Sequence, residues 1–174
     1  FLQSQPQLYA FVKEHYPTLY ERVKDYVKQG RWEITGAGWI EQDTNVPSGE
    51  SHVRQFLYGN RFYEEQFGHR TRMVWLPDCF GFSFSFPQIM KKAGIDYFAT
   101  WKMNWNQYTD HSYHFFRWRG IDGSEITTVS FPWLCTGSPN PRDVHGAWNA
   151  FHQKDICDEM PYVFGHGDGG GGPT

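Results

Sequence analysis

The residues best suited to chemistry lie in loops that follow predicted strands. Asp78 comes directly after the apolar run Met73–Leu76, which is typical of a buried strand. Pro77 lacks a backbone donor and ends that strand, and Gly81 allows the chain to turn. Asp78 is therefore predicted at the carboxyl end of a strand, where α/β folds gather their sites. There it can act as a nucleophile or a metal ligand, unless it only caps the helix predicted to begin near Ser83.

Other polar and aromatic candidates occupy similar positions. Trp39 and Glu41 lie in a glycine-containing loop after one predicted strand, and Lys102 and Trp105 follow another. Trp39 could stack on a ring of a ligand while a carboxylate binds its polar groups, or it could simply pin its loop as a buried residue. Lys102 and Trp105 could line another side of such a site, although Lys102 could also be a solvated loop residue. Asp168 precedes four glycines whose amides can approach a ligand, which favours ligand binding over a plain turn.

The predicted elements alternate between helices and strands, which indicates a parallel sheet. A Gly-Ile-Asp-Gly-Ser turn at residues 120–124 predicts a hairpin. The helix at 50–67 is expected to turn Val53, Phe56, Leu57 and Tyr63 inward. Helices are predicted at residues 5–15, 17–30, 50–67, 84–93 and 144–157, and strands at 31–35, 73–76, 97–99, 115–119, 125–131 and 162–164.

Several blocks of this chain resemble, in order and spacing, glycoside hydrolase family 38, the class II α-mannosidases. The Trp-Leu-Pro-Asp-x-Phe-Gly-x-Ser run around Asp78 resembles the family's nucleophile segment. The glycine run near the end is typical of the shorter, cytosolic-type members. The other matching blocks are Gly36–Glu50, Arg54–Gly59, Phe98–Asn106, Gly120–Ser124 and Gly167–Thr174.

The resemblance implies a zinc-dependent retaining α-mannosidase that removes terminal non-reducing α-D-mannose from oligosaccharides. Asp78 would be both nucleophile and zinc ligand, and Trp39, Glu41, Lys102, Trp105 and Asp168 would bind substrate. In the family a His-x-Asp pair on a first strand and a histidine well after the glycine run complete the zinc site, and residues 1–174 contain neither of these two segments. We therefore expect an internal fragment of a single N-terminal catalytic domain, inactive by itself, with the fold of a partial irregular (β/α) barrel, mostly parallel and truncated at both ends.

Two other functions stay open from the sequence. A metal-dependent carbohydrate deacetylase would use Asp78 to serve a metal-bound water, and a non-catalytic carbohydrate-binding relative would have lost its metal. The acid/base residue of a mannosidase is not assigned, because Asp143 is expected to cap the helix that follows it. His111 and His114 have a spacing that can bind metal, but solvated loop histidines are the commoner case.

The amino-acid composition limits the classes of molecule that this chain is expected to bind. The net charge is −3 and the basic residues are scattered, which argues against nucleic acid. No apolar run approaches the ~20 residues of a membrane span. Three cysteines without a Cys-x-x-Cys pair favour a reducing, cytoplasmic location. Cys79 has no base beside it in the sequence and is not expected to be a reactive thiol. The expected partner is an oligosaccharide; association with further copies of the chain is left open.

Overall fold

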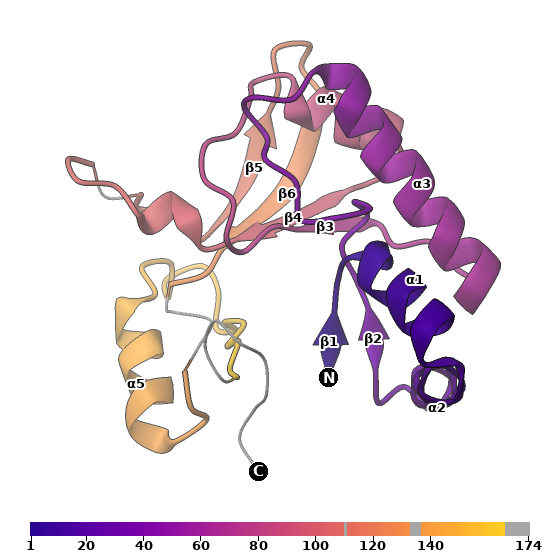
Figure 1. The fold of residues 1–174 in the computed structure, drawn as a ribbon. Helices are drawn as coiled ribbons and strands as arrows, with labels where there is room; N and C mark the ends of the chain where they lie inside the picture. The colour runs from indigo at the N-terminus through magenta and orange to yellow at the C-terminus, as the bar shows by residue number, and fades with distance from the viewer. Residues whose placement is uncertain (110, 133–136, 166–174) are drawn as a thin grey trace.

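The computed structural model describes residues 1–109, 111–132 and 137–165. It has a mixed α/β fold (Figure 1). The helices are α1 (Pro6–His15), α2 (Pro17–Lys28), α3 (Gly49–Phe67), α4 (Phe86–Lys92) and α5 (Pro141–Ala150), with a 3-10 turn, η1, at Lys102–Asn104. The strands are β1 (Leu2–Gln3), β2 (Glu33–Ile34), β3 (Met73–Trp75), β4 (Tyr97–Thr100), β5 (Phe115–Arg119) and β6 (Glu125–Ser130).

The strands form two small sheets. β1 pairs with β2 in parallel, and the larger sheet has the order β3-β4-β6-β5. Within it β3, β4 and β6 are parallel and β5 returns antiparallel to β6, as the predicted hairpin requires. The Ala37 N–H donates to the Met73 carbonyl at 3.0 Å and so links the two sheets. The parallel sheet is confirmed, but in the described residues the strands do not close into a barrel.

Helix α3 contributes side chains to two clusters of buried hydrophobic residues. Its buried Phe56 packs with Phe86 of α4 and Phe98 of β4, over one face of the larger sheet. Its buried Tyr63 packs with Tyr9 of α1 and with the β2 region. Figure 1 shows this long helix running from α4 toward α1. α3 therefore fixes the N-terminal helices relative to the sheet.

The inner face of α3 differs from the one predicted. Phe56 and Tyr63 are buried as expected, but Val53 and Leu57 are 45% and 58% exposed. Between Phe56 and Tyr63, the buried positions of the helix are Gly59 and Asn60. A Cβ on Gly59 would overlap the Ala37 carbonyl oxygen, so the loop after β2 lies directly on the helix there. This close approach rotates the buried stripe away from Leu57.

The C-terminal elements also depart from the prediction. Helix α5 begins at Pro141 rather than Val144, because the Asn140 side chain accepts a hydrogen bond from the Asp143 N–H at 2.9 Å and caps the helix. Asp143 is thus a first-turn residue and not the cap. The last predicted strand is reduced to a single bridge between Gly137 and Phe164. No helix in the described residues is long and apolar enough to cross a membrane.

Candidate functional site

Asp78 lies in the loop that leaves the carboxyl end of β3. The Leu76 N–H still donates to the Ala99 carbonyl at 3.0 Å, so the pairing of β3 with β4 extends one residue beyond the strand and stops before Asp78. Helix α4 starts much later, with Ser85 at its N-cap position, so Asp78 does not cap a helix. The Asp78 side chain is 73% exposed. The carboxylate is therefore free to meet a ligand.

Lys102 supplies a cation to Asp78. Its Nζ lies 2.6 Å from Asp78 Oδ1, and the lysine side chain is only 5% exposed. The two residues follow neighbouring parallel strands, β3 and β4, whose carboxyl ends share one edge of the sheet. The ammonium group therefore fixes the position of one Asp78 carboxylate oxygen at this edge of the sheet.

Aromatic rings surround the Lys102 ammonium group. Its Nζ lies 3.4 Å from the centroid of the Trp105 ring and 4.2 Å from that of Trp101. Cation–π contact of this kind stabilises a charge that burial would otherwise disfavour. Trp105 itself is 64% exposed, so one part of its indole remains open to a ligand.

Glu41 contacts the same loop from the opposite side. Its Oε1 accepts a hydrogen bond from the Asp78 backbone N–H at 2.9 Å. Burial raises the pKa of the Glu41 carboxyl, the Asp78 amide acts in the opposite direction, and the negative charge of Asp78 adds to the rise. The carboxyl oxygens of Glu41 and Asp78 suit a polyhydroxylated ligand or a cation.

Two further contacts fasten the Glu41 loop to the Asp78 loop. The Thr44 hydroxyl donates to the Gly81 carbonyl, and the Cys79 thiol donates to the Gln42 carbonyl at 3.0 Å. Gly81 has a φ of +83°, and a Cβ there would overlap the Asn45 side-chain amide. The glycine is thus required by both its backbone conformation and its neighbour. These contacts hold Asp78 between two rigid segments.

The thiol beside Asp78 is not reactive in this setting. Burial raises the pKa of Cys79 to about 12, and the charges of Glu41, Asp43 and Asp78 act in the same direction. Nucleophilic chemistry needs the thiolate. The Cys79 thiol is therefore not available as a nucleophile.

A hollow of about 480 Å³ opens beside Lys102. This volume lies within the usual range of small-ligand pockets, roughly 300–1,000 Å³. Hydroxyl, amide and imidazole groups on its wall can hydrogen-bond a sugar. Its lining residues are Gly81, Phe82, Lys102, Met103, Asn106, Thr109, His111, Ser112 and Tyr113.

The described residues do not form a complete zinc site. Across residues 1–109, 111–132 and 137–165, no three histidine, cysteine, aspartate or glutamate side chains are grouped so as to hold a metal. Zinc normally takes at least three protein ligands, and here Asp78 and Glu41 offer two carboxylates. His114 is buried, with Nδ1 3.1 Å from the Ser130 carbonyl and Nε2 3.1 Å from the Ala150 carbonyl, so it is not available as a ligand.

Of the six site residues predicted from the sequence, the structure brings Glu41, Asp78, Lys102 and Trp105 together. Trp39 lies against α3 in a different pocket, and Asp168 is outside the described residues. Sequence reasoning did not anticipate Thr44 as a partner of the Asp78 loop. The hydrogen bond from Thr44 to Gly81 joins residues 37 apart in the chain, and no local sequence pattern predicts it.

Comparison with known proteins decides the family. The model of the glycosyl hydrolases family 38 N-terminal domain matches residues 1–174. The chain belongs to family 38. It is 45% identical over 176 residues to α-mannosidase G of Dictyostelium discoideum, covering 100% of this chain and 16% of that protein. It is 39% identical over 184 residues to human α-mannosidase 2C1, covering 100% and 17% respectively. This family 38 chain therefore spans about a sixth of the length of these relatives.

The fold agrees with that of a solved family relative. An α-mannosidase from Enterococcus faecalis V583 superposes with a TM-score of 0.66 at 25% identity, covering 88% of this chain and 18% of the other. The family 38 chain thus has the architecture of part of an α-mannosidase.

Proposed function

We propose that the full-length protein is a retaining α-mannosidase that hydrolyses terminal non-reducing α-D-mannose from oligosaccharides, with Asp78 as its nucleophile. The observation that carries the proposal is the pairing of an exposed carboxylate at the carboxyl end of β3 with a buried lysine at 2.6 Å. Membership of family 38 and the α-mannosidase names of the relatives favour this activity over a deacetylase or a binding protein.

The chemistry assigned to Asp78 is a double displacement. The carboxylate attacks the anomeric carbon of mannose, the glycosidic C–O bond breaks, and the leaving oxygen takes a proton from a general acid. Water then gives a proton to the conjugate base of that acid and attacks the same carbon, which releases mannose and restores the Asp78 carboxylate. Two inversions give net retention of configuration.

The neighbours of Asp78 have supporting roles in this proposal. Lys102 orients the Asp78 carboxylate through its ammonium group, and Glu41 holds the Asp78 backbone through its N–H. Trp105 offers an open indole face for the sugar beyond the scissile bond. Asp168 is proposed to bind substrate hydroxyls, and Glu41 can do the same with the carboxylate oxygen that does not face Asp78.

Zinc is proposed as the cofactor, with Asp78 as one ligand and the others supplied by segments outside residues 1–174. When bound, the metal would act as a Lewis acid on substrate hydroxyls and help fix the sugar. The exposed Asp78 carboxylate fits one position of such a site. A cytoplasmic location is also proposed, in keeping with the free thiols of Cys79 and Cys157 among the described residues.

The direct test replaces Asp78 with asparagine in the full-length protein. Asp78→Asn is expected to lower kcat on an aryl α-mannoside by at least about a thousandfold, because the amide cannot form the covalent intermediate. Bound zinc should also fall in elemental analysis. Asp96→Asn is a matched control, since Asp96 Oδ1 likewise lies 2.6 Å from a lysine, Lys91, but outside the Asp78 site. Near wild-type activity in Asp78→Asn would refute the assignment.

A further inference from the structure

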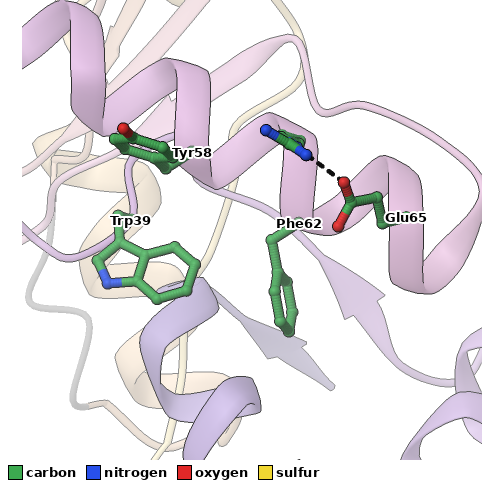
Figure 2. Close-up of a pocket in the computed structure, with 5 residues that line it drawn as sticks. Trp39, Tyr58, Phe62 and Glu65 are labelled. Atoms are coloured by element: carbon green, nitrogen blue, oxygen red, sulfur yellow. Dashed lines mark hydrogen bonds and ion pairs between the residues drawn. The ribbon is translucent and has the colours of Figure 1, made fainter.

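A second pocket is lined by residues of α3 and of the loop after β2, and none of its lining residues belongs to the Asp78 site. Trp39 comes from the loop after β2, and Tyr58, Arg61, Phe62 and Glu65 come from α3 (Figure 2). The four helical residues are spaced three or four apart around adjacent turns, so they share one face of the helix. The pocket has a volume of about 330 Å³.

Trp39 is held in place by backbone contacts. Its N–H donates to the Gln55 carbonyl at 3.0 Å, and its carbonyl accepts from the Gln7 N–H at 3.1 Å. The Ile40 N–H donates to the Gln55 side-chain oxygen at 3.0 Å. The absence of a side chain at Gly59 allows this loop to lie on the helix. The indole is therefore positioned before any ligand arrives, which lowers the entropic cost of binding.

The aromatic walls suit the apolar face of a sugar ring. The Trp39 and Phe62 rings meet edge to face, with centroids 5.7 Å apart and planes at 83°. In Figure 2 the benzene edge of Trp39 points toward Phe62 and the indole nitrogen points the other way. Tyr58 is 48% exposed and adds a hydroxyl that both donates and accepts. Such amphipathic rings combine contact area with hydrogen bonding.

The charged rim is electrically balanced. Arg61 Nε donates to Glu65 Oε1 at 2.8 Å, and both side chains are more than half exposed. One cation paired with one anion does not favour a charged ligand. The remaining guanidinium donors and the second carboxylate oxygen instead match a neutral group that is donor and acceptor at once, as a sugar hydroxyl is.

We infer that the pocket formed by Trp39, Tyr58, Arg61, Phe62 and Glu65 is a second carbohydrate site, which binds a pyranose ring of a neutral oligosaccharide without hydrolysing it. Its volume lies at the small end of ligand pockets, which suits one or two sugar rings. The choice of a mannose-containing ligand rests on the proposed function. The stacking site itself does not depend on hydrolysis at Asp78.

The test uses the full-length protein carrying Asp78→Asn, so that the probe, an α-linked mannotriose, is not consumed. Calorimetric titration is expected to reveal a second binding event. Adding Tyr58→Ala should weaken that event roughly threefold to tenfold, the usual contribution of one aromatic wall. Glu65→Gln, which keeps the shape of the side chain, should weaken it as well. Leu57→Ala is the matched control, because Leu57 is exposed on the same helix outside the pocket.

Two results would overturn the inference. One is an identical titration with and without Tyr58→Ala. The other is a change in sedimentation on Tyr58→Ala with no change in mannotriose binding, which would make the pocket an interface between copies. Hydrolysis of an aryl α-mannoside by the Tyr58→Ala protein with Asp78 intact should match wild type. Absence of hydrolysis in the wild type, together with Tyr58-dependent binding, would refute the proposed function and leave this site standing.

Discussion

Trp39 and Glu41 are two residues apart on one loop and face two different surfaces. Glu41 is half-buried and accepts a hydrogen bond from the Asp78 backbone, 37 residues further along the chain. Trp39 packs edge to face on Phe62 and lines the pocket on α3. Two residues that are close in sequence therefore need not belong to the same site. The loop serves a reactive carboxylate on one side and an aromatic pocket on the other.

The largest loss of activity is expected from a substitution of Lys102, which lies on the Asp78 side of the comparison. Lys102→Met fills the buried volume but removes the cation beside Asp78 Oδ1. We expect kcat on an aryl α-mannoside to fall by roughly ten- to a hundredfold, because a preorganised charge at the reacting group is lost. Lys91→Met removes a surface lysine from an equally short pair and should leave kcat unchanged. Equal kcat values for the two variants would show that Lys102 has no role in hydrolysis.

The contrast within the loop is tested by substituting each residue in turn. Glu41→Ala removes the acceptor of the Asp78 N–H and should lower kcat by roughly tenfold, since misplacement of a reacting group is costly. Trp39→Ala should leave kcat on a small aryl mannoside within about twofold, because its ring lies in the other pocket. Steady-state kinetics of both variants provide the measurement. If Trp39→Ala lost as much kcat as Glu41→Ala, the division of the loop into two sides would be wrong.

The smallest predicted effect is on stability and concerns the helix that supports the loop. Gly59→Ala places a methyl group on the Ala37 carbonyl and should destabilise the fold by about 1–3 kcal/mol, seen as a lower Tm. Gly49→Ala is the control at the start of the same helix, where the added Cβ meets only Ile89 Cδ1 at 3.6 Å. A Tm for Gly59→Ala equal to that of Gly49→Ala would show that the loop can move off the helix.

The order of helices and parallel strands could be predicted from apolar periodicity, together with the position of Asp78 after β3. The nearness of Asp78 and Lys102 follows from the same reasoning, because loops after neighbouring parallel strands share one edge. The start of α5 was also readable, since Asn140 followed by Pro141 is a standard helix opening. Sequence reasoning overlooked that signal and placed the start at Val144.

The direction of Trp39 could not be predicted locally. It depends on the contact between Ala37 and Gly59, which are 22 positions apart, and this contact also exposes Leu57 on α3. The hydrogen bond between the Thr44 hydroxyl and the Gly81 carbonyl also joins residues that are far apart in the sequence. Such contacts depend on how two loops pack in three dimensions, and neither periodicity nor composition encodes that packing.

The central claim is that Asp78 attacks the sugar, and one measurement tests it most directly. The full-length protein, loaded with zinc, would be incubated with a fluorinated mannosyl fluoride, digested and analysed by peptide mass spectrometry. We predict a covalent mannosyl adduct on the peptide that contains Asp78, and none in Asp78→Asn. An active protein that forms no adduct, or carries it on another peptide, would contradict the account.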